Sequence, residues 1–420
     1  MAGYKVSDVY GISRDLPLNY VSREWADDAF IASLTRDKHV VVYGSSKQGK
    51  TSLVKHCLKE EDYVKVQCSN KWGLSNLNAA ILKAAGYKMT TTEKISVSGK
   101  AKVLATFTGW LGLKVGGEAE VGRASEVTTQ SLELDIDDVN DIIEALECVK
   151  FKKFIVLDDF HYLTEETQRD FAVQLKAFHE ASELCFVVIG VWLEENRLIV
   201  YNGDLTGRIV AINADLWTAE KLQEVVRSGE GLLNIKFVDY FKDAVIGGSY
   251  ESVYIVQEAC HRACVESGCH STVSDEITLG DGLDAEAIIR AVVNEQSGRY
   301  DTFLRNFADG FQTTELEMYK WILYPIIMCD DRELNAGFKA SEVRKRIAEK
   351  HPRGADLNPG NVIQALKFAT SLQIQKQIKP IILDYDQTNG RLSVVDRSFI
   401  IWKKYQDRED LLEKIGLQGM

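Results

Sequence analysis

The sequence predicts an α/β fold, in which a core built on a parallel sheet is followed by a helical region and a small C-terminal domain. Short runs rich in apolar residues, each preceding a segment of helical spacing, indicate buried parallel strands. These runs lie at 39–43, 63–68, 154–157, 184–190 and 209–212. Because strands and helices alternate along this part of the chain, we expect helices on both faces of the sheet. The length of 420 residues allows two or three domains.

A glycine-rich motif follows the first predicted strand. Residues 44–51 fill every position of the phosphate-binding pattern G-x-x-x-x-G-K-[ST]. Its glycines let consecutive backbone N–H groups point at one anion, and the next helix places the phosphates at its N-terminus. Lys50, which we expect to face solvent without nucleotide, can reach the β- and γ-phosphates, and the Thr51 hydroxyl can hold Mg²⁺. We therefore predict binding of ATP and Mg²⁺ through Gly44, Ser45, Ser46, Lys47, Gln48, Gly49, Lys50, Thr51 and Ser52.

A pair of acids ends another predicted strand. Asp158 and Asp159 follow the apolar run 154–157, so a parallel strand delivers them to the ligand edge of the sheet. We assign Asp158 to Mg²⁺ and Asp159 to orienting and activating the attacking water. In the alternative interpretation, both acids only cap the helix that begins near Glu165.

The composition is that of an ordinary soluble protein. A formal net charge of −12 argues against a broad surface that coats nucleic acid, although it allows a local basic patch. No secretion signal and no membrane-spanning run is evident, and eight scattered cysteines favour reduced thiols, so we expect a cytoplasmic protein without membrane association. Cys260, Cys264 and Cys269 could bind zinc together with His261 and His270. The i, i+4 spacing of the first two favours small core residues instead.

A segment at about 92–135 interrupts the α/β pattern. Apolar and polar residues alternate from Ile95 to Phe107, glycines follow, and alternation resumes at 115–121, which is typical of a β-hairpin insertion. The apolar residues Trp110, Leu111 and Leu113 lie near the expected tip. Such a tip indicates contact with a neighbouring subunit, a partner or a ligand. A hairpin that folds back on its own domain is the equally open alternative.

The chain leaves the predicted sheet near Trp217. We expect the α/β core at 1–216, a helical lid and connector at 217–313, and a third domain at 314–420. In that domain, helices at 316–329, 340–350 and 358–372 precede strands at 380–385 and 391–396, joined by a tight turn at Asn389-Gly390. This order is typical of a winged helix, whose third helix commonly reads DNA. The third helix here carries only the mild polar residues Gln364, Lys367, Thr370 and Ser371, so we favour docking of protein or autoinhibition over DNA contact.

The order of phosphate loop, acid pair, helical lid and winged helix resembles the AAA+ superfamily. The similarity is greatest to the branch that contains STAND signalling ATPases and origin-recognition initiators, and it covers about residues 14–405. The resemblance implies that Tyr20 and Val21 contact adenine. It also implies an arginine that acts on the γ-phosphate, often across a subunit boundary, and Arg208 is the candidate. A surface ion pair is the other interpretation of Arg208.

Several features of the family pattern are missing. The strand after the acid pair ends in Gly190-Val191-Trp192 instead of a polar sensor residue, and no lid arginine is identifiable at 247–251. Hydrolysing members mostly carry Glu where Asp159 stands, and Asp is one methylene shorter. These departures imply slow turnover, which fits a nucleotide switch better than a fast motor.

Three functions are compatible with these observations. The preferred one is a slowly hydrolysing regulatory ATPase, a homo-oligomeric assembly switch coupled to a partner effector protein. By analogy, bacterial chains of this build often serve defence against phage. The alternative is a DNA-binding initiator or transposition-type ATPase that uses the winged helix. A third is a scaffold that holds nucleotide without hydrolysing it.

Overall fold

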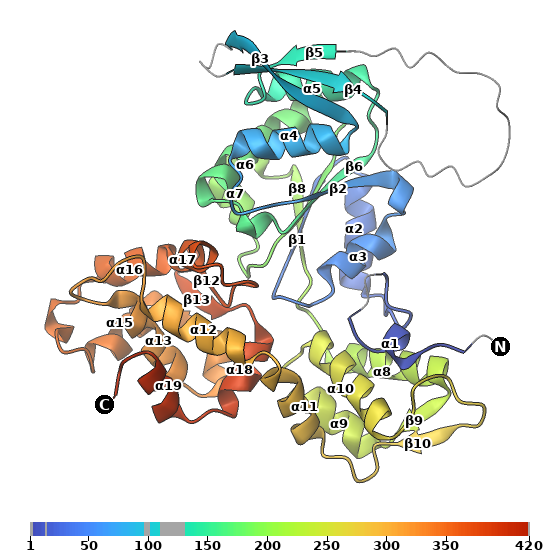
Figure 1. The fold of residues 1–420 in the computed structure, drawn as a ribbon, viewed down its shortest axis with the longest axis vertical. Helices are drawn as coiled ribbons and strands as arrows, with labels where there is room; N and C mark the ends of the chain where they lie inside the picture. Colours follow the sequence, from blue (N-terminus) through green and yellow to red (C-terminus); the bar gives the residue numbers. More distant parts are fainter. Residues whose placement is uncertain (1–2, 13–14, 96–100, 110–130, 419–420) are drawn as a thin grey trace.

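The computed structural model describes residues 3–12, 15–95, 101–109 and 131–418 (Figure 1). Its core is a parallel five-stranded sheet with the order β2-β6-β7-β1-β8. The chain leaves the carboxyl end of β1 where the strand order changes direction, and such points in open parallel sheets form ligand-binding crevices. The strands are β1 (His39–Tyr43), β2 (Tyr63–Gln67), β6 (Phe154–Asp158), β7 (Phe186–Ile189) and β8 (Ile209–Asn213).

Helices cover both faces of this sheet (Figure 1). Val40 and Val42 of β1 pack toward α2 (Glu24–Leu34) and α3 (Lys50–Cys57). The alternate residues Val41 and Tyr43 pack toward the opposite face. Both faces are therefore buried, which explains the nearly continuous apolar character of these strands. The second face is covered by α4 (Leu74–Ala84), α5 (Val139–Cys148) and α6 (Glu165–Ala181), and the connections contain α7 (Arg197–Tyr201), η1 (Glu60–Asp62), η2 (Phe160–Tyr162) and η3 (Gly203–Leu205).

The insertion is a three-stranded antiparallel sheet of β3 (Tyr87–Ile95), β4 (Ala101–Phe107) and β5 (Ser131–Leu134). The alternation from Ile95 to Phe107 belongs to two strands, because β3 ends at Ile95 and the antiparallel β4 covers Ala101 to Phe107. Strand β3 escaped detection because its polar threonines show no apolar alternation. The buried Tyr87 donates a hydrogen bond to the Ala145 carbonyl (2.5 Å), so the described strands pack against their own domain. The expected tip residues Trp110, Leu111 and Leu113 lie outside the described residues.

The region after the sheet is helical and also receives the N-terminus. The short helix α1 (Val6–Val9) packs on it, and the buried Tyr10 hydroxyl donates to the Val226 carbonyl (2.6 Å). The first described residues thus pack with the lid, although we assigned them to the domain at 1–216. The buried Cys260 and Cys264 lie in its core, and the described chain holds no group of three or more potential metal ligands. The lid contains α8 (Ala219–Leu233), β9 (Ile235–Phe237), α9 (Asp239–Gly248), α10 (Val253–Glu266), β10 (Ile277–Leu279) and α11 (Ala285–Asn294).

The C-terminal domain has the winged-helix order, with an antiparallel sheet β11-β13-β12. Its helices are α12 (Ser297–Ala308), α13 (Met318–Met328), α14 (Asp331–Ala336), α15 (Ala340–Ala348), α16 (Pro359–Lys367), α17 (Ala369–Gln375), α18 (Arg397–Lys404) and α19 (Arg408–Lys414), with a 3-10 turn η4 (Gly354–Asp356). Its strands are β11 (Phe338–Lys339), β12 (Leu383–Asp386) and β13 (Arg391–Val394). The predicted fold class is confirmed: a parallel α/β core, an inserted β-hairpin, a helical lid and a winged helix.

Two details of the winged helix differ from the prediction. The third helix is divided at Phe368 into α16 and α17, because the buried Gln373 fixes α17 to the hairpin by accepting hydrogen bonds from Ile382 N (2.7 Å) and Leu383 N (3.0 Å). The hairpin has a four-residue loop at 387–390 instead of a tight two-residue turn. Within the part of the chain described, no helix has the length and apolar character needed to cross a bilayer.

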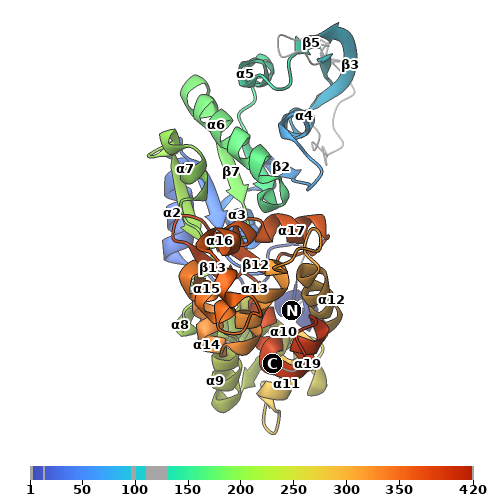
Figure 2. The same cartoon turned by 90° about the vertical axis from the view of Figure 1, so that its left-hand side faces the viewer.

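The winged-helix domain packs against the core beside the carboxyl ends of the strands (Figures 1 and 2). The buried Arg197 of α7 pairs with Asp384 of β12 (2.6 Å) and with Glu194 (3.3 Å). An apolar cluster next to these ion pairs joins Tyr162 and Val191 of the core to Ile381 and Val395. The third domain is thereby held next to the two predicted nucleotide motifs.

Candidate nucleotide-binding site

A cavity of about 420 Å³ lies at the carboxyl end of β1, between the sheet and the lid. The structure brings most of the predicted site residues together around it: Tyr20, Val21, Ser46, Lys47, Gln48, Gly49, Lys50, Thr51, Ser52, Asp158 and Asp159. Gly44 and Ser45 lie in the same loop behind the lining, whereas Arg208 lies elsewhere. Lid residues Val253, Tyr254 and Gln257 line the opposite wall, so the cavity is enclosed by two domains.

The phosphate loop has the backbone that its glycines allow. Gly44 (φ 137°) and Gly49 (φ 77°) both adopt positive φ, and Gly49 is the N-cap of α3. The first N–H groups of a helix have no intrahelical acceptor, so those of α3 are available to an anion. The loop is also tied to the lid, because the Gln48 side chain bonds to the Glu251 carbonyl (3.2 Å) and to Val253 N (3.3 Å).

We expected Lys50 to face solvent, but the side chain is buried. Only 7% of the residue is exposed, and its ammonium donates to the carbonyls of Gly44 (3.0 Å) and Ser45. Burial lowers the pKa of Lys50 to about 8, opposed by the nearby carboxylates of Asp215 and Asp158. The loop curls around the side chain, which explains why a long charged residue is buried here.

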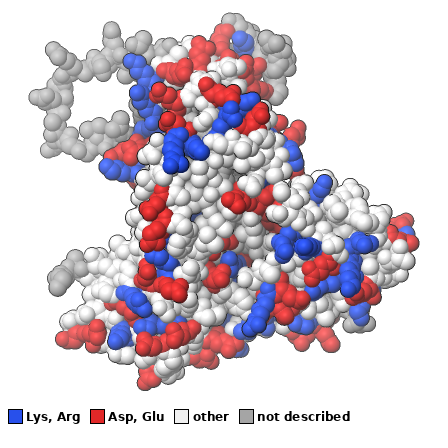
Figure 3. Space-filling view, turned by 180° about the vertical axis from the view of Figure 1, so that it is seen from behind, with Lys and Arg blue, Asp and Glu red and all other residues white. Residues whose placement is uncertain are grey.

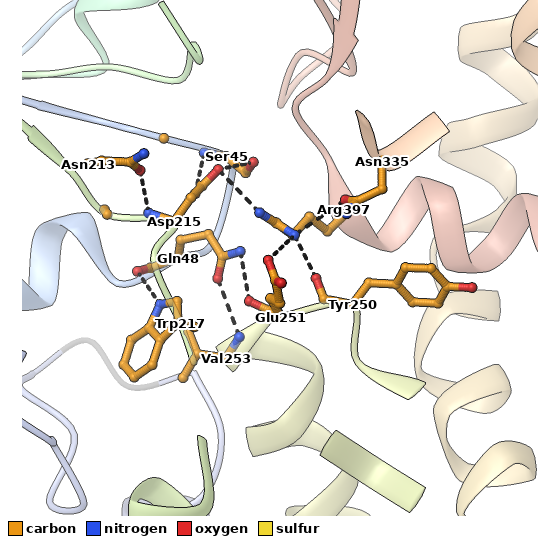
Figure 4. A network of polar contacts seen from close by, with 12 residues as sticks. Ser45, Gln48, Asn213, Asp215, Trp217, Tyr250, Glu251, Val253, Asn335 and Arg397 are labelled. Atoms are coloured by element: carbon orange, nitrogen blue, oxygen red, sulfur yellow. Dashed lines mark hydrogen bonds and ion pairs between the residues drawn. The ribbon is translucent and has the colours of Figure 1, made fainter. Parts of the chain in front are cut away.

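Asp215 contacts the phosphate loop and is not among the site residues predicted from the motifs. Its carboxylate accepts hydrogen bonds from Ser45 N (2.6 Å) and Ser45 Oγ (2.5 Å), and it lies 3.7 Å from Arg397 of the winged helix (Figure 4). A Cβ on Gly44 would lie 2.7 Å from this carboxylate, so only glycine fits there. Since Asp215 is the second residue after β8 and β8 pairs with β1, its position at the ligand edge could have been inferred from the sheet.

The acid pair is held by side chains of β2. Asp158 pairs with Lys65 (2.6 Å) and also accepts a hydrogen bond from Asp159 N (2.9 Å). Asp159 accepts from the Gln67 amide (2.5 Å). Burial, together with the charge of Asp158, raises the pKa of Asp159. Neither acid caps α6, because Thr164 occupies that position and accepts from Thr167 N, so the capping interpretation is wrong.

The donor set fits Mg²⁺ and a triphosphate. Thr51 and Asp158 line the same cavity, and hydroxyl and carboxylate oxygens are the ligands that this hard cation takes. Lys50 and the N-terminus of α3 supply positive charge for phosphate oxygens. When bound, the metal would offset phosphate charge; the protein's own groups would orient the triphosphate and the water.

Of the two residues that we expect to contact adenine, Tyr20 and Val21, Tyr20 already has partners within the protein. Tyr20 lines the cavity, but its ring stacks on His56 (centroids 4.4 Å apart) and its hydroxyl donates to Asp27 (2.7 Å). The buried Asn19 amide contacts the Gln257 side chain of the lid (2.9 Å), which connects the two walls at this end. The apolar residues Val21 and Val225 complete a surface suited to a flat base.

Arg208 lies just before β8, at the amino end of the strands and thus opposite the phosphate loop. Its guanidinium pairs with Glu180 (2.6 Å) on the surface and also donates to the Asp204 carbonyl. It cannot reach the cavity of its own chain, so a role at the γ-phosphate would require a neighbouring copy.

Comparisons with known proteins give a structural likeness only. No protein-family model matches the chain, and no curated protein matches it. Among solved structures, it is similar to a Walker-type ATPase of Pyrococcus abyssi, at 12% identity and TM-score 0.47 over 92% of this chain and 99% of that one. It is also similar to Orc1 of Aeropyrum pernix in complex with DNA (12% identity, TM-score 0.43, 95% and 96%) and to RuvB of Thermotoga maritima (12%, 0.37, 89% and 92%). Likeness at this level transfers no activity.

Proposed function

We propose that this chain is a slowly hydrolysing regulatory ATPase, a nucleotide-dependent assembly switch that is coupled to a partner protein. The main support is that groups of all three domains meet at the phosphate loop. The phosphate loop, the acid pair and the lid line it, while the winged helix touches the same loop through a hydrogen bond from Ser46 N to the Val395 carbonyl (2.8 Å). Nucleotide bound in this cavity would therefore lie next to the contacts that the lid and the winged helix make with the phosphate loop.

Arg397 of the winged helix supports the coupling part of the proposal. Besides its approach to Asp215, it donates to the Tyr250 carbonyl (2.7 Å) and pairs with Glu251 (3.3 Å) of the lid (Figure 4). Tyr250 and Glu251 both adopt positive φ, 51° and 60°, which costs energy for residues other than glycine. A strained loop held by an arginine from another domain is a suitable place for a conformational change.

The proposal of slow ATP turnover rests on two features, the shorter acid Asp159 and the apolar end of β7. A setting in defence against phage rests on analogy alone.

ATP with Mg²⁺ is expected to promote self-association, and Arg397→Ala should lower the nucleotide concentration required. The variant removes the contacts that hold lid, loop and winged helix together, so the closed arrangement loses stability. Light scattering after size exclusion, with no nucleotide, ADP or ATPγS, measures the assembly. Arg353→Ala is the matched control, because the ion pairs of Arg353 among the described residues, with Glu315 and Asp356, lie within its own domain. A protein that stays monomeric in every nucleotide state, with partner absent and present, contradicts the proposal.

The DNA-binding alternative finds less support. Binding of DNA by the winged helix would have to rest on a few local bases, namely Lys367, Lys376, Lys379 and Arg391. Of these, Lys379 lies over the Tyr162 ring (4.2 Å) and Arg391 donates to two backbone carbonyls. On the face in Figure 3, basic and acidic side chains are interspersed over the domain. We expect weak binding of duplex DNA at physiological salt. A sub-micromolar, salt-sensitive complex that is lost when Lys376 and Lys379 become Glu, with ATP turnover unchanged, would favour the initiator function.

A further inference from the structure

The end of strand β7 offers no polar side chain to the cavity. Ile189, Gly190 and Val191 line it there. A Cβ on Gly190 would lie 1.5 Å from the ring of the buried Trp192, so no larger residue fits at this position while that ring is in place. Any side-chain polar contact with a ligand on this wall must therefore come from another element.

His161 is the polar residue of this wall without a partner. It lies in η2, directly after the acid pair, lines the cavity and is only 1% exposed. Both ring nitrogens lack a hydrogen-bond partner within the described residues. Buried polar atoms are nearly always hydrogen bonded, so two unsatisfied nitrogens on one ring require an explanation, and a missing ligand supplies one.

The surroundings of this imidazole suit an anion. Burial lowers the pKa of His161 well below its usual range, and the positive charges of Lys50, Arg197 and Lys379 lower it further, so the ring is neutral at pH 7. A neutral imidazole keeps one N–H donor and one acceptor nitrogen. Arg197 already has two carboxylate partners, whereas the hydrogen-bond acceptors of Lys50 are uncharged carbonyls. An anion between Lys50 and His161 would satisfy both groups.

We infer that His161 contacts the γ-phosphate of bound ATP and replaces the polar sensor that β7 lacks. The inference rests on the proposed binding of ATP. In this inference one ring nitrogen bonds to an oxygen of the terminal phosphate, whereas ADP leaves that nitrogen without a partner. His161 is thus a specificity-determining residue for triphosphate over diphosphate.

The neighbour of His161 carries the signal outward. The ring centroids of Tyr162 and His161 lie 4.0 Å apart, and the Lys379 ammonium of the winged helix lies over the Tyr162 ring. Tyr162 also packs with Ile381 and Val395. A change at His161 therefore acts directly on the interface between the core and the winged helix.

Calorimetric titration of the full chain with ATPγS and with ADP, both with Mg²⁺, tests the inference. His161→Leu, which keeps the volume but removes the nitrogens, should weaken ATPγS binding roughly tenfold or more and leave ADP binding within about twofold. His161→Gln, which retains a donor, should restore part of the loss. The control His56→Leu alters the ring beside Tyr20 at the other end of the cavity, so it should change both affinities equally.

The outcomes separate this inference from the proposed function. Unchanged ATPγS and ADP affinities in both His161 variants, or an equal loss of both, would overturn the role of His161 while ATP binding by the wild type stands. A wild-type protein that binds neither nucleotide would overturn the proposed function and this inference with it. Unchanged ADP affinity also shows that a variant is folded, and His161→Gln provides the test should His161→Leu fail to fold.

Discussion

Lys50→Ala is expected to abolish ATP binding, with a loss of affinity above roughly a hundredfold. The ammonium is the only positive side-chain group that the motif directs at the β- and γ-phosphates, and it is already buried inside the loop. Its removal leaves the Gly44 and Ser45 carbonyls without this donor, so we expect a modest decrease in stability as well, about 1 kcal/mol. Retention of radiolabelled ATP by the folded variant at the wild-type level would exclude the assignment.

The pH dependence of ATP binding tests the role of Lys50 in the wild-type protein, without a substitution that disturbs the packing of the loop. The pKa of Lys50 in the free protein is about 8, and a bound triphosphate must raise it because it stabilises the ammonium. Below pH 8, Lys50 is protonated in both the free and the ATP-bound protein, so its titration does not change the affinity for ATP. Above pH 8 the free protein loses this proton, and the affinity should fall by at most about tenfold per pH unit. The variant Lys50→Arg stays charged and should not show this fall. An affinity that is flat from pH 7 to 9 in the wild type contradicts the linkage.

The nucleotide motifs could be predicted because their chemistry is local in sequence. The loop around Lys50 and the acids after β6 follow from spacing and from the rule that parallel strands deliver their ends to one edge. Asp215, His161 and Arg397 belong to the same region but come from three separate segments, and only the packing of lid and winged helix brings them together. No periodicity or motif in the sequence predicts that these three residues lie close together.

The errors in the fold have equally specific causes. Strand β3 is polar and lacks the alternation by which half-buried strands are recognised. The division of the third winged-helix helix depends on Gln373, whose amide binds the backbone of a strand ten residues later. Lys50 is buried because the loop's own carbonyls accept hydrogen bonds from its ammonium, an arrangement that hydrophobicity patterns cannot show.

Asp159→Asn is expected to keep ATP bound but to reduce turnover by about a hundredfold or more, whereas Asp158→Ala should weaken Mg²⁺-dependent binding itself. The raised pKa of Asp159 makes its carboxylate a better proton acceptor for a water, and Asn retains the shape without that basicity. Metal charge, in contrast, offsets phosphate repulsion already in the ground state, so loss of its ligand appears in affinity. ATP titrations with Mg²⁺ and with EDTA, together with steady-state turnover, separate the two effects.

Lys65 provides the control that distinguishes a metal ligand from a structural acid. It is the ion-pair partner of Asp158 at 2.6 Å, and about 40% of its side chain is exposed. If Asp158 mainly stabilises β2 through this pair, Lys65→Ala and Asp158→Ala should have the same effect on ATP binding. If Asp158 holds Mg²⁺, Lys65 competes with the metal for one carboxylate, so Lys65→Ala should leave Mg²⁺-dependent affinity unchanged or increase it. Equal losses in the two variants, or normal hydrolysis by both Asp158→Ala and Asp159→Asn, would show that the acid pair has no part in the chemistry.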